Sequence, residues 1–334
     1  MQRGARAFWL REPGVGEIRD VLLPEPRPDD VVVRTLRSAV SRGTESLVFR
    51  GRVPASQREA MRAPFQDGDF PGPVKYGYLS VGLVEHGPGR LLGRNVFCLH
   101  PHQTAYVVPA EAVVPVPDGV PVARAVLAGI VETAVNALWD APPLLGDRIA
   151  VVGAGVLGCS VARLASRVPG TSVTLVDVDA SRASVAAALG VGFALPDDAP
   201  AGRDLVVHTS ATSAGLQHSL DLLAGEGTVL ELSWYGDEPT TVSLGGSFHS
   251  GRLALRASQV GRVAPARRDS RTTSQRLALA LDLLRDDAFD CLLTGESSFE
   301  DLPEVMPRLV SRELPALCHS VTYPAGDEEV RCSA

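Results

Sequence analysis

Residues 149–158 read IAVVGAGVLG, an apolar run that leads directly into glycines at positions 153, 155 and 158. The apolar part predicts a buried strand, Ile149–Ala154, and the residues from Val156 to about Ser166 predict a helix. A strand that turns through glycines into a helix brings backbone N–H groups together at the positive end of the helix dipole. The segment therefore predicts a site for an anionic group such as a pyrophosphate.

An acidic residue strengthens this interpretation. Asp177 ends the next predicted strand, Ser172–Val176, where a carboxylate accepts hydrogen bonds from an adenosine ribose in dinucleotide-binding domains. The same carboxylate would repel a 2′-phosphate, so NAD is favoured over NADP. Arg182 could contact the ribose or, against this preference, a 2′-phosphate. The alternative is a glycine-rich turn in a domain of this type that binds no ligand.

Strands and helices alternate on both sides of this segment. This order predicts a doubly wound parallel sheet covered on both faces, the Rossmann arrangement. The further strands expected are residues 204–209, 227–232 and 253–258, and the further helices residues 182–189, 214–223 and 274–285.

The first part of the chain follows a different pattern. Short β-like runs separated by proline and glycine predict an all-β, partly open barrel with almost no helical periodicity. The expected strands are residues 5–10, 31–38, 78–86, 95–99 and 105–108. We therefore expect an α/β protein with a β-rich domain at 1–118, a Rossmann domain at 119–285 and a C-terminal segment, 286–334, that packs back on the first domain.

Composition excludes several classes of protein. The chain of 334 residues has a formal net charge of -7, which argues against a nucleic-acid surface. No apolar run approaches the length of a membrane helix. Five cysteines show no CxxC pair, so we expect a cytoplasmic protein with reduced thiols; they are Cys98, Cys159, Cys291, Cys318 and Cys332.

Motifs outside the glycine-rich turn resemble the medium-chain dehydrogenase/reductase family along nearly the whole chain. The segments that carry the resemblance are Gly43-Thr44-Glu45, Gly77 with Gly82-Leu83-Val84, and Thr133-Ala134. Ser41–Glu45 and Ser258–Gly261 are similar to its zinc-free branch, which contains bacteriochlorophyllide hydroxyethyl dehydrogenases. The resemblance implies a GroES-like catalytic domain before the Rossmann domain, and a homodimer formed through the edge strand at residues 253–258. It also adds Thr133 to the cofactor-binding residues, which are Thr133, Gly153, Gly155, Val156, Leu157, Gly158, Asp177 and Arg182.

The positions that match the family's catalytic zinc ligands differ from its zinc enzymes. They hold Arg42, Tyr78 with Leu79, and Gly129, and none of these is a usual zinc ligand. The segment that would carry a structural zinc, about residues 98–109, is short and contains one cysteine. We therefore expect no metal.

Four residues are candidates for the chemistry that zinc would otherwise supply. Arg42 could stabilise a developing alkoxide, or it could bind the cofactor pyrophosphate. Tyr78 could transfer a proton if Lys75, the only lysine, lowered its pKa; it could equally be a packed core residue. Thr44 matches the family's proton-relay hydroxyl. Glu132 could act as a base or bind substrate, or it could be the partner of Arg42.

Other polar residues allow more than one role. Glu45, beside Thr44, could be catalytic or could accept hydrogen bonds within a loop. His100 and His102 have the H-x-H spacing of a metal site, but a histidine in such a segment is more often structural. The role of His249 stays open.

The sequence favours one function over two others. The leading hypothesis is a zinc-independent oxidoreductase that transfers a hydride between NAD(H) and a secondary alcohol or ketone of a small molecule. A zinc-free, NADPH-dependent reductase of activated C=C bonds, similar to quinone reductases, is the second. The third is a nucleotide-binding protein without catalysis.

Overall fold

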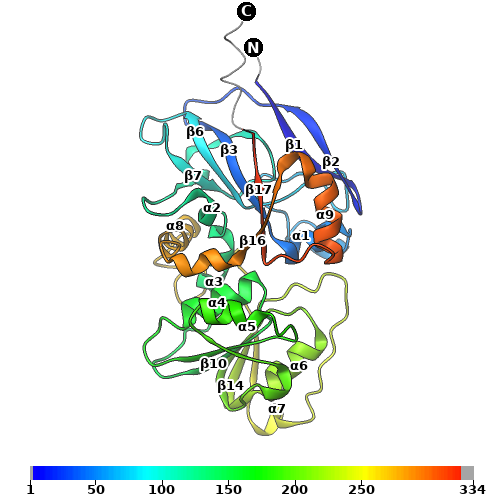
Figure 1. Cartoon of the computed structure of the whole chain (residues 1–334), viewed down its shortest axis with the longest axis vertical. Coiled ribbons are helices and arrows are strands. Elements are labelled where there is room, and N and C mark those ends of the chain that lie inside the picture. Colours follow the sequence, from blue (N-terminus) through cyan, green and yellow to red (C-terminus); the bar gives the residue numbers. More distant parts are fainter. Residues whose placement is uncertain (1–2, 325–334) are drawn as a thin grey trace, which may run out of the picture. The chain divides into compact units, whose positions relative to one another are not determined.

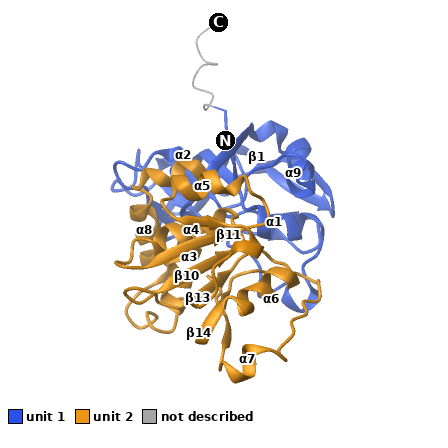
Figure 2. Cartoon of the chain, turned by 60° about the horizontal axis from the view of Figure 1, so that its bottom comes forward, with its two compact units in different colours: residues 1–129, 293–334 blue, residues 130–292 orange. Residues whose placement is uncertain are grey.

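The computed structural model describes residues 3–324, and the chain divides into two compact units, shown in different colours in Figure 2. Unit 1 comprises residues 1–129 and 293–334, and unit 2 comprises residues 130–292. The sequence suggested unit boundaries at 118/119 and 285/286. In the structure both boundaries lie later in the chain, at 129/130 and 292/293. The reason is that the short helix at Val122–Ala125 packs against a strand of unit 1.

Unit 2 is built on a six-stranded sheet whose strands are ordered β12-β11-β10-β13-β14-β15. Two of these strands, β10 and β14, are labelled in Figure 1. All neighbouring strands in the sheet are parallel. The strands are β10 (Arg148–Val152), β11 (Ser172–Val176), β12 (Gly192–Ala194), β13 (Arg203–His208), β14 (Leu223–Glu231) and β15 (Ala254–Ala257). The helices are α3 (Ala128–Asp140), which begins in unit 1, α4 (Val156–Ala165), α5 (Arg182–Ala188), α6 (Ser213–Asp221), α7 (Ser247–Ser250) and α8 (Thr273–Leu283).

Strand order and register locate the binding edge of this sheet. The order reverses between β10 and β13, and ligands of doubly wound sheets bind at such a switch point, beyond the carboxyl ends of the strands. Val152, His208 and Glu231 are neighbours in the last register row of β10, β13 and β14. Gly153 and Thr209 follow this row at the switch point.

The core of unit 2 explains why these strands form. The apolar side chains of β10 and β13 are buried against the amphipathic helix α6 in one cluster, which also contains residues of β11 and β14. Its buried members are Ala150, Val152, Val176, Val206, Leu216, Leu220, Leu222 and Val229. A parallel strand covered on both faces is apolar throughout, as the IAVV run indicated.

Unit 1 contains two sheets, ordered β2-β1-β5-β4 and β16-β17-β3-β6-β7-β9, with β8 paired to β3 in the second. The C-terminal strand β17 pairs antiparallel with β3. The strands are β1 (Gly4–Glu12), β2 (Val15–Leu22), β3 (Asp30–Val40), β4 (Asp67–Gly68), β5 (Val74–Lys75), β6 (Ser80–His86), β7 (Asn95–Cys98), β8 (Ala105–Pro109), β9 (Val113–Pro115), β16 (Leu293–Ser298) and β17 (Cys318–Thr322). The helices are α1 (Arg42–Phe49), α2 (Val122–Ala125) and α9 (Leu302–Ser311).

Two helices of unit 1 were not expected from the sequence. Helix α1 has the poor helix formers Gly43 and Thr44 in its first turn but buries Val48 and Phe49. Helix α9 contains prolines, including Pro307 in its interior, yet it buries one apolar face. In both cases tertiary packing outweighs weak local propensity.

The α/β fold class with a β-rich unit and a Rossmann unit is confirmed. Within residues 3–324, no helix is both long and apolar enough to cross a bilayer. Cys98, Cys159, Cys291 and Cys318 are free thiols, and Cys332 lies outside the described residues.

Candidate functional site

The glycine-rich turn of unit 2 has the geometry of a dinucleotide-binding turn. A Cβ on Gly158 would lie 2.0 Å from the carbonyl oxygen of Gly153, so only glycine allows helix α4 to pack this closely on the turn. A Cβ on Gly155 would meet no atom within 4 Å. The turn is therefore closed toward the protein at Gly158 and open at Gly155, where a phosphate could approach the backbone.

The first turn of α4 offers donors to that open space. Gly155 is the N-cap residue, and no side chain caps the helix. The first N–H groups of a helix have no partner within the helix. Those of Val156 and Leu157, both half-buried, can therefore bind an anion with support from the helix dipole.

Asp177 is held against this turn. One carboxylate oxygen, Oδ2, accepts the backbone N–H of Ala154 at 2.7 Å, and Oδ1 accepts the N–H of Asp179 at 2.9 Å. Each oxygen keeps a further lone pair for a ribose hydroxyl. Arg182 forms an ion pair with Asp179 (Nε to Oδ2, 3.2 Å), so a carboxylate offsets its charge.

Two glycine substitutions separate packing from ligand binding. Gly155→Ala is expected to weaken NADH binding roughly ten- to a hundredfold, because overpacking costs about 1–3 kcal/mol. Stability should change little, since the added methyl group meets open space. Gly158→Ala is expected to lower stability as well. Calorimetric titration and thermal unfolding of both variants test this, and equal loss of stability in the two would contradict it.

In unit 1, the start of α1 brings together several of the predicted catalytic residues. Arg42 is the first residue of the helix, and Thr44 lies in its first turn. The Tyr78 hydroxyl donates to Ser41 Oγ at 2.6 Å. The sequence did not single out Ser41 as a partner of Tyr78.

The pKa of Tyr78 is raised, contrary to the expectation that Lys75 would lower it. Burial raises it to about 12, although hydrogen bonds with Ser41 and Thr44 act in the opposite direction. Lys75 instead donates to Gln103 Oε1 at 3.0 Å and lies 3.9 Å from Asp67. Tyr78 is therefore a neutral phenol that can donate a proton or a hydrogen bond, and a poor base.

Glu45 is part of a buried polar chain. Its Oε1 accepts the backbone N–H of Ser41 at 2.7 Å, and its Oε2 lies 3.0 Å from His102 Nε2. His102 Nδ1 contacts Ser38 Oγ at 2.7 Å, and Ser38 contacts the Tyr323 hydroxyl at 2.8 Å. These contacts give Glu45 a structural role at the start of α1.

His100 is also a core residue. Its ring stacks on Tyr106, with 3.8 Å between centroids, and its Nδ1 lies 3.0 Å from the Pro101 carbonyl oxygen. Burial lowers the pKa of His100 to about 3, and the nearby Lys75 and His102 act in the same direction. His249, in α7, is exposed.

The neutral state of His100 predicts acid sensitivity. An unfolded histidine takes up a proton near pH 6.5, whereas His100 in the folded protein does so only near pH 3. The unfolded state binds the extra proton between these values, so stability falls as the pH drops, by about 1.4 kcal/mol per pH unit from this group. Urea unfolding at pH 7, 6 and 5 should show a shallower decline for His100→Phe than for the wild type. His249→Phe is the control, and identical slopes for His100→Phe and wild type would contradict the prediction.

Glu132, which one interpretation of the sequence made the partner of Arg42, pairs with Arg276 within unit 2. Its Oε1 accepts from Arg276 Nε at 3.0 Å, and both side chains are buried. Burial raises the pKa of Glu132, while the charge and hydrogen bond of Arg276 oppose this. Arg276 also donates to Asn136 Oδ1 at 2.5 Å and to the backbone carbonyl of Val260 at 2.6 Å. Thr133, the next residue of α3, is half-buried.

Two of the positions that the resemblance matches to zinc ligands, Leu79 and Gly129, are packed against each other. Leu79 is fully buried, and a Cβ on Gly129 would lie 2.6 Å from its Cδ2. Within residues 3–324, no three His, Cys, Asp or Glu side chains are arranged to hold a metal ion.

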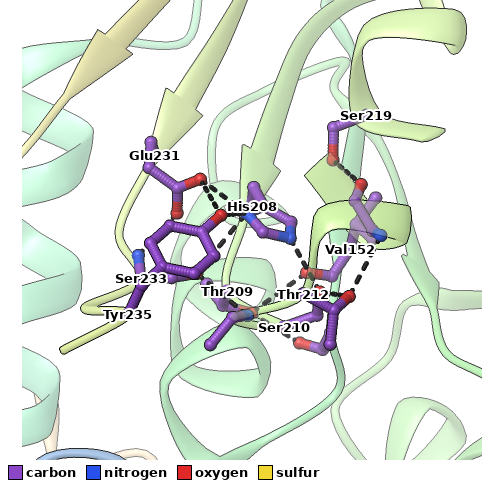
Figure 3. A network of polar contacts seen from close by, with 12 residues as sticks. Val152, His208, Thr209, Ser210, Thr212, Ser219, Glu231, Ser233 and Tyr235 are labelled. Atoms are coloured by element: carbon purple, nitrogen blue, oxygen red, sulfur yellow. Dashed lines mark hydrogen bonds and ion pairs between the residues drawn. The ribbon is translucent and has the colours of Figure 1, made fainter. Parts of the chain in front are cut away.

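The sequence analysis also missed polar residues of unit 2. His208, Ser210, Glu231 and Tyr235 form a hydrogen-bonded network at the carboxyl ends of β13 and β14 (Figure 3). The available signal was the polar HTS that follows the apolar LVV at the end of a predicted strand.

Solved structures share this fold. L-idonate 5-dehydrogenase from Escherichia coli K-12 aligns with a TM-score of 0.79 and 14% identity over 96% of this chain and 99% of its own. A Sinorhizobium meliloti 1021 protein named as a zinc-binding dehydrogenase, bound to NADP, aligns with a TM-score of 0.76 and 18% identity over 96% and 100%. A short chain alcohol dehydrogenase of E. coli CFT073, in complex with NADH, gives 0.75 and 16% over 96% and 99%. No protein-family model and no curated protein sequence matches this chain.

Proposed function

We propose that the protein is an NAD(H)-dependent oxidoreductase that transfers a hydride between the dinucleotide and a secondary alcohol or ketone of a small molecule, without zinc. The observation that carries the proposal is the turn that is open at Gly155, with the Asp177 carboxylate held beside it by the N–H of Ala154. Both features suit a pyrophosphate and an adenosine ribose. The solved structures that share the fold, one with NADP and one with NADH, support a nicotinamide dinucleotide.

The charge at Asp177 favours NAD over NADP. A 2′-phosphate would face a carboxylate, and like charges placed together in an interface cost several kcal/mol. Arg182 is the basic residue among the expected cofactor contacts. Its ion pair with Asp179 reduces the attraction that it could offer to a 2′-phosphate.

The residues at the zinc-ligand positions do not suit a zinc ion. Zinc requires thiolate, imidazole or carboxylate ligands, whereas these positions hold Arg42, Tyr78 with Leu79, and Gly129. The Leu79 side chain also occupies the space beside Gly129. The proposed reaction therefore has no step through a metal.

The chemistry would then rest on the side chains at the start of α1. A dinucleotide held at the glycine-rich turn and Asp177 would supply the hydride chemistry. Tyr78, kept protonated by its raised pKa, would turn its hydroxyl proton from Ser41 Oγ to the carbonyl oxygen of the substrate in the reducing direction. Arg42 would stabilise negative charge on that oxygen, and Thr44 would help to hold the Tyr78 hydroxyl. Glu132 takes no part, because its carboxylate is bound by Arg276.

Parallel titration with NADH and NADPH, with zinc measured on the same sample, tests the proposal. NADH should bind at least tenfold more tightly than NADPH, and turnover of secondary alcohols should survive chelation. A clear NADPH preference would favour the C=C reductase. Loss of all turnover on chelation would reject the zinc-free mechanism. If neither NADH nor NADPH bound, the proposal that the protein is a dinucleotide-dependent enzyme would be rejected.

We also infer a homodimer formed through strand β15. This strand ends the six-stranded sheet, all four of its residues are exposed, and Leu255 is 43% exposed. No strand of residues 3–324 pairs with its outer edge, and open edges of this kind favour pairing with a second chain. Light scattering should give twice the 35.2 kDa chain mass for the wild type and a shift toward monomer for Leu255→Asp. A monomeric wild type would contradict this.

A further inference from the structure

Three polar side chains form a hydrogen-bonded chain beside the glycine-rich turn, and we call them the Ser210 relay: Ser210, His208 and Glu231 (Figure 3). His208 and Glu231 lie opposite each other in the last register row of β13 and β14. His208 is also the register partner of Val152, the residue before Gly153. The relay therefore lies at the switch point, where doubly wound sheets bind their ligands.

The Glu231 carboxylate fixes one end of the relay. Its Oε1 accepts the backbone N–H of Ser233 at 2.6 Å, and its Oε2 accepts the Tyr235 hydroxyl at 2.8 Å and lies 2.7 Å from His208 Nδ1. Burial acts to raise the pKa of Glu231, but the hydrogen bonds from His208 and from Ser233 outweigh it and lower the pKa. An ionised carboxylate only accepts, so Nδ1 must carry a proton.

This proton determines the direction of the next hydrogen bond. The relay requires a neutral His208, in which the proton on Nδ1 leaves Nε2 as an acceptor. Ser210 Oγ lies 2.7 Å from Nε2 and therefore donates its only proton to His208. Thr212 Oγ1 accepts the N–H of Gly215 and lies 3.0 Å from Ser210 Oγ, so it can donate to Ser210. One lone pair of Ser210 then remains for a ligand.

The backbone leaves space for this arrangement. A Cβ on Gly215 would lie 2.1 Å from Ser210 Oγ and 2.9 Å from His208 Nε2. On the other side, a Cβ on Gly153 would lie 2.8 Å from the backbone nitrogen of Ser210. Ser210 is half-buried, whereas His208 is fully buried. Ser210 is thus the member of the relay that a ligand can reach, and His208 and Glu231 act on the ligand only through Ser210.

We propose that Ser210 is a further cofactor-binding residue that accepts a hydrogen bond from a hydroxyl or amide N–H of the bound nicotinamide dinucleotide, and that His208 and Glu231 are positioning residues that hold it as an acceptor. This inference rests on the proposed function, because it requires that a dinucleotide binds unit 2.

Glu231→Gln tests the direction of the relay with almost no change in shape. The N–H of Ser233 holds the glutamine carbonyl oxygen at the Oε1 position, so the amide NH₂ faces His208. The imidazole must then accept at Nδ1 and carry its proton on Nε2, which donates to Ser210. Ser210 would become a donor toward the ligand, and the hydrogen bond from the ligand would be lost.

A double-mutant cycle on NADH affinity separates this role from a structural one. Ser210→Ala and Glu231→Gln are each expected to weaken NADH binding roughly three- to tenfold, the range of one hydrogen bond. In the Ser210→Ala protein, Glu231→Gln should then weaken NADH binding less than about twofold, because no hydroxyl remains whose hydrogen-bond direction could change. Thermal unfolding of all four proteins is measured in parallel, and nitrogen chemical shifts of labelled histidine should show the His208 proton move from Nδ1 to Nε2 in Glu231→Gln.

The outcomes distinguish this inference from the proposed function. Additive losses of affinity, or an unchanged histidine tautomer, would overturn the relay while NAD(H) binding by the wild type still stands. A wild type that binds no dinucleotide would overturn both. The 3-acetylpyridine analogue of NADH, which lacks the amide N–H, identifies the donor: the Ser210→Ala penalty persists if a hydroxyl is the donor and disappears if the amide is.

Discussion

Arg276→Met is expected to lower the free energy of unfolding by about 3–5 kcal/mol, the cost of leaving one member of a buried ion pair without its partner. Arg276 is 2% exposed and connects α8 with Glu132, Asn136 and the carbonyl of Val260. Methionine fills much of the volume but donates no hydrogen bond. The midpoint of thermal unfolding should fall by roughly 6–20 °C, at about 2–4 °C per kcal/mol for a domain of this size.

Two further variants make the test specific. Arg285, a half-exposed arginine just beyond the end of α8, pairs with Asp282 at 2.7 Å. Arg285→Met should lower the free energy of unfolding by less than about 1 kcal/mol. Adding Glu132→Leu to Arg276→Met should recover part of the loss, because no unpaired charge is then buried. A loss no larger for Arg276→Met than for Arg285→Met would contradict the role given to the buried pair.

Asp177→Asn is expected to reduce the preference for NADH over NADPH by on the order of 100-fold, because it removes the charge that repels a 2′-phosphate. Asparagine keeps an oxygen that can accept the N–H of Ala154 at the 2.7 Å contact, so the glycine-rich turn should hold its shape. NADH binding should weaken about tenfold, since a hydrogen bond to a charged acceptor is worth about 1.5–3 kcal/mol. Parallel calorimetric titrations with the two cofactors measure both effects.

The matched control is Asp179→Asn, which removes a carboxylate two residues away that contacts Ser181 and Arg182 but not the turn. It should leave the preference within about threefold of the wild type, or shift it slightly toward NADPH by releasing Arg182. Equal affinity of the wild type for both cofactors would show that Asp177 does not select between them.

The parts of the molecule that the sequence predicted well depend on local patterns. The strand, turn and helix at residues 149–165 occupy consecutive residues, and a buried parallel strand is apolar wherever the rest of the chain lies. Asp177 could be identified because the spacing between the turn and the end of the next strand is set by one helix and one strand. The same patterns predicted the α/β fold class.

The errors arose where contacts between distant residues decide the result. Helix α1 and helix α9 contain glycine, threonine or proline at positions that weaken helices, and buried apolar faces stabilise them. The expectation that Lys75 lowers the pKa of Tyr78 was wrong, because the fold places the Lys75 ammonium against Gln103, 28 positions away. Desolvation, which depends on every neighbouring segment, raises the pKa of Tyr78 to about 12.

By itself, the sequence determined the alternating strands and helices and the glycine-rich turn with Asp177, because each depends on residue type and short-range spacing. Only the tertiary structure decided the partner of Glu132, which is Arg276, 144 positions away, and the Ser210 relay, which joins the ends of two strands. The physical reason is that hydrogen bonds and ion pairs require distances near 3 Å. Such distances between separate segments are set by how the sheet and helices pack, and no local pattern encodes them.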